Sequence, residues 1–406
     1  MRTRSIAVAM AAGLLAASII AGPAHGATTL TVRAGMGFGK TIPAGTARIM
    51  APDQDGNPTV NVHTDDVIHF AGAAPALLPQ GQEPMSWWDQ YGGGSGRPFS
   101  FFVSDPDADS QGVDAPNKVN PTVENGNANG CGDSEANACS YDGSDADPVT
   151  GVLNPGDTQQ FYVKITASPN TTLWALNPPP TAHTILRINV VPNGQAATTQ
   201  AELDSAKTSG LAKDLRTYHR VVKKLSKPTF TSSGGHRVYD AYAGYDTETV
   251  SILRMLPQKL HIKKGDSIEW HFHILRELHT VTFPFKKGEA ISNSGFVPEC
   301  DPDGDGGQGP DTPADFSATP PCPQGSGLEL DLTRSLTEKT GDGTFPGGSN
   351  TLESSGLHGA LVPHLDGMEG GTDPFTLRFP KASGKNGFRY LCALHGSFMS
   401  GWVFVK

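Results

Sequence analysis

Charged residues are scarce in this 406-residue sequence, at 18% of the chain against about 25% in an ordinary soluble domain. The net charge is −10, and lysine and arginine form no dense block. A long charged helix, a coiled coil and a nucleic-acid-binding protein are therefore not expected, because phosphate binding needs a basic surface. Glycine and proline are plentiful instead, with 48 and 32 residues, which favours a folded protein with many turns and long loops.

Long apolar runs are also missing, apart from one near the start of the chain. That run extends from Ile6 to Ile20, follows two arginines, and precedes the small residues Ala24 and Gly26. This order is typical of a secretory signal peptide that is cleaved after Gly26. A membrane anchor is the alternative, but the run is short for one. Residues 1–26 are therefore predicted to be a signal peptide, and the mature protein is predicted to be soluble, without a membrane span, and secreted or otherwise extracytoplasmic.

Cysteine is rare, with five residues and none before Cys131. Export would place these cysteines in an oxidising compartment, where pairing is expected. Cys131 and Cys139 bracket one polar loop, and Cys300 and Cys322 bracket another, so two local disulfides are predicted, although spacing alone leaves the connectivity open. Cys392 is then left over, and metal ligation would protect its thiol.

Cys392 begins a short run of potential metal ligands. The segment spaces Cys392, His395 and Met399 as C-x2-H-x3-M. The residues before Cys392 and the alternating apolar run at the end of the chain indicate two strands, so the thiolate, imidazole and thioether can face one point on the loop between them. One more imidazole would complete the His2Cys site with a long axial Met that is typical of blue copper.

The missing imidazole is expected from His279. It stands in an H-T-V-x-F segment after a K-G-D turn and strand that begin at Lys264. In these motifs and in their order, the last third of the chain resembles the plastocyanin/azurin-type cupredoxins. The resemblance implies a β-sandwich that binds one type 1 copper per chain, with His279, Cys392, His395 and Met399 as the ligands.

Two other interpretations of Cys392 are weaker. A buried thiol beside a structural histidine is one, but an unpaired cysteine in an exported chain, with a Met in register and an upstream His, argues against it. Zinc is the other, but structural zinc prefers more thiolates or imidazoles and does not need Met. Copper is therefore the predicted cofactor.

The front half of the chain echoes the back half. Residues 60–70 match 260–270, and residues 173–177 match 391–395, with a pair of loop cysteines between these landmarks in each half. A duplicated cupredoxin domain is the simplest account.

The two copies differ at the ligand positions. Trp174 aligns with Cys392, Asn177 aligns with His395, and the counterpart of His279 falls near Ala74, where no histidine occurs. The first copy is therefore predicted to bind no copper, with the indole of Trp174 filling the space that the metal would take.

This organisation predicts an all-β fold of two cupredoxin-like Greek-key β-sandwiches joined by a helical linker. The degenerate sandwich is predicted over residues 27–195, the linker over 196–228, and the copper sandwich over 229–406. Within the linker, residues 200–224 show a rough apolar stripe at helical spacing.

A second ion is suggested by the loop from Asp301 to Asp305, which has the alternating carboxylates of a calcium site. Its twelfth position is Thr312 where a helix–loop–helix site has Glu. Solvated carboxylates are therefore the favoured interpretation, and calcium is the weaker one.

His271 and His273 are spaced so that both lie on one side of a strand. In multicopper oxidases an H-x-H pair helps to bind a trinuclear cluster, but the partner motif is missing because Leu391 stands before Cys392. A surface role is favoured, and a second metal site that uses His358 or another histidine is the alternative.

The predicted function is one-electron transfer by an exported blue copper protein that is not an enzyme. A redox protein partner is expected to dock near His395, beside Leu394 and Phe398, and no small-molecule substrate is identified. The alternative is a copper-handling protein whose first domain recognises a partner or ligand. An enzyme of the nitrite reductase or two-domain laccase type is disfavoured, because Leu391 occupies the position where such an enzyme needs His.

Overall fold

The computed structural model describes large parts of both halves of the chain. Its described residues are 26–35, 42–54, 56–72, 99–104, 131–143, 149–153, 160–176, 185–274, 279–294, 339, 341–348, 351–359 and 373–406. Five predicted features lie outside them: residues 1–25 of the signal peptide, Ala74, Asn177, the Cys300–Cys322 pair and the Asp301–Asp305 loop. Within the described part, no helix combines the length and the apolar character needed to cross a bilayer.

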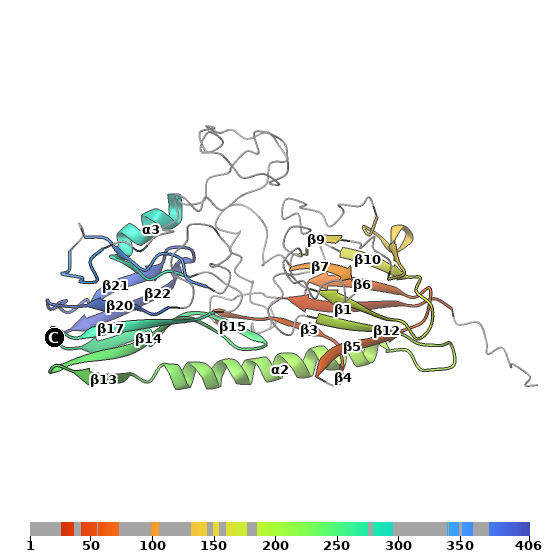
Figure 1. Cartoon of the computed structure of the whole chain (residues 1–406), viewed down its shortest axis with the longest axis horizontal. Helices are drawn as coiled ribbons and strands as arrows, with labels where there is room; N and C mark the ends of the chain where they lie inside the picture. Colours follow the sequence, from red (N-terminus) through yellow and green to blue (C-terminus); the bar gives the residue numbers. More distant parts are fainter. Residues whose placement is uncertain are drawn as a thin grey trace, which may run out of the picture.

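Strands dominate the described chain and form four sheets, which lie as two groups at opposite ends of an elongated molecule (Figure 1). Each group buries apolar side chains from both of its sheets, such as Val32 and Ile188 in the first and Ile268 and Val403 in the second. The predicted all-β class, with two cupredoxin-like sandwiches joined by a helix, is confirmed.

The first sandwich uses strands from the front half of the chain. One sheet contains, in spatial order, β3 (Arg48–Met50), β1 (Thr29–Gly35), β6 (Val67–Gly72), β10 (Gln160–Ile165) and β8 (Cys139–Tyr141). The other contains β4 (Asp53–Gln54), β5 (Asn57–Val62), β12 (Ile185–Val190), β11 (Thr172–Leu176), β7 (Phe99–Ser104) and β9 (Val149–Leu153). A short 3₁₀ helix, η2 (Glu135–Asn137), precedes β8.

The second sandwich uses mainly strands from the back half. One sheet contains β2 (Ala44–Thr46), β15 (Val250–Leu256), β14 (His236–Asp246), β17 (Ser267–His273) and β20 (Phe375–Arg378), and β13 (Thr229–Ser233) also pairs with β14. The other contains β16 (Lys259–Ile262), β22 (Gly396–Val405), β21 (Phe388–Cys392), β18 (Thr282–Phe283) and β19 (Glu353–Ser354). The helix α3 (Phe285–Ser294) follows β18.

The strand orders repeat between the two sandwiches. The order β3-β1-β6-β10 corresponds to β15-β14-β17-β20, and β5-β12-β11-β7-β9 corresponds to β16-β22-β21-β18-β19. Directions correspond as well, because β1 and β6 are parallel like β14 and β17, and β12 and β5 are parallel like β22 and β16. The internal repeat predicted from sequence is therefore present in the topology.

Alternation of side chains explains how these strands pack. In β17, Ile268, Trp270 and Phe272 are buried, whereas Glu269 and His271 between them are partly exposed. Successive side chains of a strand point to opposite faces, so the apolar set faces the core and the polar set faces outward. Strands of this pattern are stabilised chiefly by the apolar area that they remove from water.

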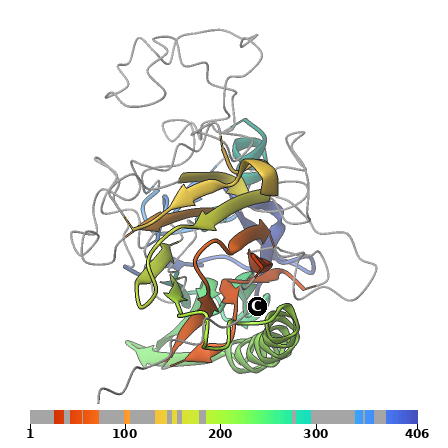
Figure 2. The same cartoon turned by 90° about the vertical axis from the view of Figure 1, so that its right-hand side faces the viewer.

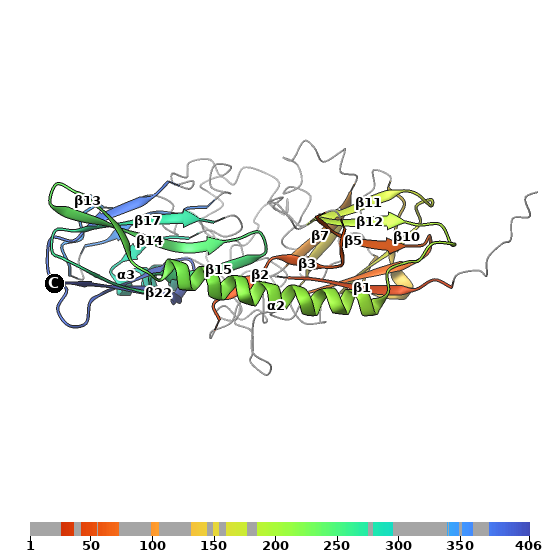
Figure 3. The ribbon, with the colours of Figure 1, turned by 90° about the horizontal axis from the view of Figure 1, so that it is seen from below.

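A single long helix, α2 (Gln200–Leu225), runs beside both sandwiches (Figure 3) and is seen end-on in the view along the molecule (Figure 2). It agrees with the helix predicted over 200–224. Its first turn is closed by a capping box, in which Thr199 accepts from the backbone N–H of Glu202 and the Glu202 carboxylate accepts from the backbone N–H of Thr199. Such a cap satisfies backbone donors that the helix cannot pair itself.

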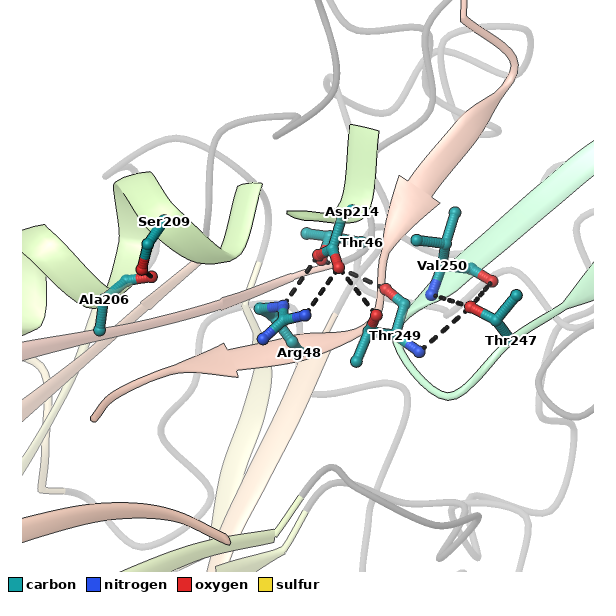
Figure 4. A network of polar contacts seen from close by, with 8 residues as sticks. All are labelled: Thr46, Arg48, Ala206, Ser209, Asp214, Thr247, Thr249 and Val250. Atoms are coloured by element: carbon teal, nitrogen blue, oxygen red, sulfur yellow. Dashed lines mark hydrogen bonds and ion pairs between the residues drawn. The ribbon is translucent and has the colours of Figure 1, made fainter. Parts of the chain in front are cut away.

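Asp214 in the middle of α2 holds the two sandwiches to the helix (Figure 4). Its buried carboxylate accepts from Arg48 Nε at 2.9 Å and from Arg48 Nη2 at 2.7 Å. It also accepts from the hydroxyl of Thr46 and, at 2.7 Å, from that of Thr249 in the β14–β15 connection. Gly210 lets this pairing form, since a Cβ there would come within 2.9 Å of Arg48 Cδ.

The strand β2 crosses between the sandwiches. It precedes β3 in the chain, but Ala44 pairs with Ile252 and Thr46 with Val250 in the second sandwich. The predicted 27–195 domain therefore contributes one strand to a sheet that otherwise belongs to 229–406. The division of the chain at 195 and 228 stays a prediction, and any cut between the two parts would remove β2 from its sheet.

Candidate metal centre

Three potential metal ligands converge inside the second sandwich. Cys392 ends β21, His395 lies in the turn before β22, and His279 lies just before β18. Cys392 and His279 are fully buried, and His395 is 7% exposed. Their ligand atoms all lie within 4.8 Å of one another, although His279 is more than 110 residues away in sequence.

The spacing of these atoms fits one ion. His279 Nδ1 lies 3.1 Å from His395 Nδ1, and Cys392 Sγ lies 3.3 Å from His395 Nδ1 and 3.9 Å from His279 Nδ1. Donors that share an ion through bonds of about 2.0–2.3 Å lie about 3–4 Å apart. A thiol and two imidazoles, each presenting a ring nitrogen or sulfur to the same point, are also the donor types that copper and zinc take.

The hairpin of β21 and β22 places Cys392 and His395. The register jumps at the strand end, because Leu391 pairs with Ser400 while Cys392 pairs with Gly396. The backbone N–H of His395 donates to the carbonyl of Cys392 at 3.2 Å and closes the turn. The C-x2-H spacing therefore turns both side chains into one pocket, as the sequence predicts.

Met399 lies in β22 within the segment that the register jump leaves between the two pairs. Its side chain is fully buried and belongs to the same apolar core as Cys392. Burial of a flexible thioether in this core is compatible with the predicted axial role, which stays a prediction.

His279 is held by the segment that contains His358. The backbone N–H of each residue donates to the carbonyl of the other at 2.9 Å. The ring of His358 in turn stacks on Phe272, with centroids 3.8 Å apart. This bridge fixes the backbone from which the His279 imidazole projects.

Gly244 provides the space for that imidazole. It lies at an irregularity in β14, has a φ of +78°, and a Cβ on it would come within 2.3 Å of His279 Nε2. Any side chain here would therefore displace the ring, besides being strained by the backbone conformation. Sequence analysis missed both Gly244 and the role of His358, because neither contact leaves a periodic pattern.

The thiol of Cys392 is enclosed by backbone and hydroxyl donors. The backbone N–H of Thr280 donates to Cys392 Sγ at 3.3 Å, and the backbone N–H of Ala393 donates to Thr280 Oγ1 at 2.7 Å. Burial raises the pKa of Cys392, and the nearby N–H groups act in the opposite direction. Metal uptake must therefore displace a proton from this thiol.

Cys392 is the free cysteine of the described chain, while Cys131 and Cys139 form a disulfide. The predicted local pairing of Cys131 with Cys139 is confirmed. The sulfur on which the copper prediction depends is not bridged to any described cysteine.

The first sandwich treats Trp174 differently from the prediction. In β11, Leu173 and Ala175 are buried in the core, while Trp174 between them is partly exposed. Because side chains alternate, Trp174 points to the face opposite the core. The idea that its indole fills the place of a metal is therefore wrong.

The H-x-H pair does not act as a pair. His273 donates to or accepts from the carbonyl side of β14, with Nδ1 2.9 Å from the oxygen of Asp246, and stacks on Tyr245. His271 instead lies with Asp240 and Glu269, and the ligand atoms of these three residues are within 4.8 Å of one another. Sequence analysis named His271 but missed the two carboxylates, because Asp240 comes from the neighbouring strand.

Comparison with known proteins returns distant structures only. No family model matches the sequence, and no curated protein matches it. A multicopper oxidase aligns at 10% identity with a TM-score of 0.18, over 64% of this chain and 65% of its own. A blue copper oxidase from Nitrosomonas europaea aligns at 12% and 0.17, over 64% of each chain, and a copper nitrite reductase from Nitrosomonas europaea at 12% and 0.18, over 93% and 94%.

These alignments span less than two thirds of either oxidase, and TM-scores this low carry no argument for a particular activity. They do correct one expectation. The sequence predicts a protein that is not an enzyme, whereas all three neighbours are named as enzymes, so that expectation is withdrawn. Its basis, Leu391 in place of His, concerns only one route from a copper site to a substrate.

Proposed function

We propose that this chain is an exported type 1 copper protein that accepts and donates one electron at a time. His279, Cys392 and His395 would hold the metal in one plane, with Met399 as the weak axial ligand. The observation that carries the proposal is the convergence of two imidazole nitrogens on an unpaired, fully buried thiol. Bound copper would supply a one-electron couple and a strong thiolate-to-copper absorption band.

The residues around the site prepare it for such a metal. The N–H of Thr280 that donates to Cys392 Sγ favours the thiolate form. The bridge to His358 and the space left by Gly244 hold the His279 ring in one orientation. Burial of all three donors excludes water from the plane of ligands. A preformed, dry donor set limits rearrangement when the charge of the site changes.

Docking of a redox protein partner near His395 belongs to the same proposal. His395 and Leu394 are 7% and 8% exposed, and Phe398 next to them is partly exposed. The turn between β21 and β22 thus brings a ligand and apolar side chains close to the surface. An apolar patch of this kind suits a transient encounter, in which the partner must leave after each electron.

The proposal is tested by adding Cu²⁺ to the purified chain and recording its visible spectrum and metal content. One copper per chain and an intense blue band are expected, and Cys392→Ser should abolish the band. The matched control is the double variant Cys131→Ser/Cys139→Ser, which removes two sulfurs far from the site and should keep the band. A folded chain that binds copper without the band, or a band that survives Cys392→Ser, contradicts the proposal.

A copper-handling role is the second candidate. It is favoured by the first sandwich, in whose described residues no comparable group of ligands comes together. Chemical reduction separates the two: an electron-transfer protein keeps its copper through repeated reduction and oxidation, whereas a copper carrier releases it. Assays of the copper-loaded chain with nitrite and with phenols show whether the electron is also used in a reaction on this chain.

A further inference from the structure

A row of polar side chains crosses the outer face of the second sandwich. Thr229 of β13 pairs with Asp240 of β14, Asp240 pairs with Glu269 of β17, and Glu269 pairs with Thr376 of β20. Residues in register on neighbouring strands lie side by side on the same face of a sheet. His271 follows Glu269 on this outward face of β17.

The three central side chains of this row make one compact group. His271 Nε2 lies 3.2 Å from Asp240 Oδ1 and 3.6 Å from Glu269 Oε1. The three ligand atoms are within 4.8 Å of one another, and each side chain is about one third exposed. The group is therefore open to an ion from solvent, unlike the buried centre at Cys392.

Neighbouring residues orient the group. The hydroxyl of Thr229 donates to Asp240 Oδ2 at 2.7 Å, and that of Thr376 donates to Glu269 Oε2 at 3.4 Å. The ring of Tyr242 lies beside His271, with centroids 5.3 Å apart. In each carboxylate the hydroxyl bond uses one oxygen and leaves the other directed at His271. Hydrogen bonds of this kind hold metal ligands in place in known sites.

The charges of the group are unbalanced. Asp240 and Glu269 are two neighbouring carboxylates, and within the described residues neither forms an ion pair with lysine or arginine. Their one basic neighbour, His271, carries a positive charge only when protonated. Two like charges at this distance repel each other, and a bound cation would remove that repulsion.

We propose that Asp240, Glu269 and His271 form a second metal site, which takes a divalent transition metal of the zinc type. Two carboxylate oxygens and one imidazole nitrogen are ligands that Zn²⁺ accepts, and the exposed side leaves positions for water. The imidazole distinguishes the site from one for Ca²⁺ or Mg²⁺, which prefer oxygen ligands alone. The site shares no residue with the centre at Cys392 and does not depend on copper binding there.

The test is a calorimetric titration of the full chain with Zn²⁺. The chain is used after copper loading and, so that the result does not rest on copper uptake, also as the Cys392→Ser variant. One zinc is expected to bind at the outer face in both forms. His271→Ala and Asp240→Asn should each weaken it by more than about tenfold, as loss of a ligand costs at least what loss of a supporting residue does.

His273→Ala is the matched control, because it removes a histidine two residues further along β17 that contacts Asp246 and Tyr245 instead. It should leave the zinc affinity unchanged, and circular dichroism should show all variants folded. Two results overturn the site: no saturable zinc binding at millimolar concentration, or a zinc affinity that His271→Ala and Asp240→Asn leave unchanged. In the second case any bound zinc lies elsewhere on the chain.

Discussion

The two sandwiches of this chain have the same strand order and different strand ends. In the second, β21 ends at Cys392 and the next turn carries His395, which meets His279 from before β18. In the first, the corresponding strand β11 carries partly exposed Trp174 between two buried neighbours. No group of three potential ligands comes together in the part of the first sandwich that the structure describes.

This difference separates what makes the fold from what makes the site. The strand order depends on alternating apolar residues, and many sequences satisfy that pattern. The metal centre depends on a few side chains at strand ends and on the space around them. One copy could thus keep its frame without keeping its ligands, and function has to be argued from the site.

The largest expected effect tests whether the two sandwiches behave as separate units. Asp214→Asn removes the charge that Arg48 faces, with Asp214 fully buried and Arg48 19% exposed. Breaking a buried ion pair in this way costs about 3–5 kcal/mol. We expect the free energy of unfolding to fall by about this amount, measured by urea titration, because the helix then loses its link to both β3 and the β14–β15 connection.

The control is Asp204→Asn, which changes an exposed carboxylate on the same helix and should alter the stability by less than about 0.5 kcal/mol. Equal effects of the two variants would mean that the Asp214 network does not hold the sandwiches together.

The next effect concerns the space for a ligand in the second sandwich. Gly244→Ala would place a methyl group on the His279 ring, so copper affinity should fall by about 10–100-fold, the usual effect of disturbing a residue that supports a ligand. Competition with a copper chelator measures it. Gly235→Ala is a close control, because φ there is +83° and nothing lies within 4 Å of the added methyl. If both variants lose copper equally, backbone strain and not the clash is responsible.

A smaller effect is expected from Glu353 in β19, which pairs with β18 next to the site. Burial raises the pKa of Glu353. The folded chain therefore keeps this proton at pH values where the unfolded chain has lost it, so stability falls as pH rises from the ordinary carboxyl range to the raised pKa. Glu353→Gln should flatten this part of the stability–pH curve, measured by thermal unfolding at several pH values.

The exposed Glu248, changed to Gln, controls for the loss of one negative charge. A slope that remains in Glu353→Gln would assign the pH dependence to other groups.

These contacts also mark how far the sequence could be interpreted. The spacing of Cys392 and His395 predicts their meeting, because three residues of a hairpin turn bring them together. The repeat and the helix from 200 to 224 are likewise visible as local patterns. Gly244, His358 and Asp240 are not, because each acts through a contact between distant parts of the chain. The exchange of β2 between sandwiches has the same cause, since pairing partners leave no periodic trace.

The smallest expected effect addresses the alignment of the two copies. Trp174 aligns with Cys392 in sequence, but Leu173 and Ala175 face the core of the first sandwich, as Tyr390 and Cys392 face that of the second. A shift of one residue moves a side chain to the other face of a strand. The double variant Trp174→Cys/Asn177→His, made in a Cys392→Ser background, should therefore give no blue band with Cu²⁺, because its new thiol faces outward. A blue band would show that residue 174 does reach the core, and that two substitutions are enough to restore the lost centre.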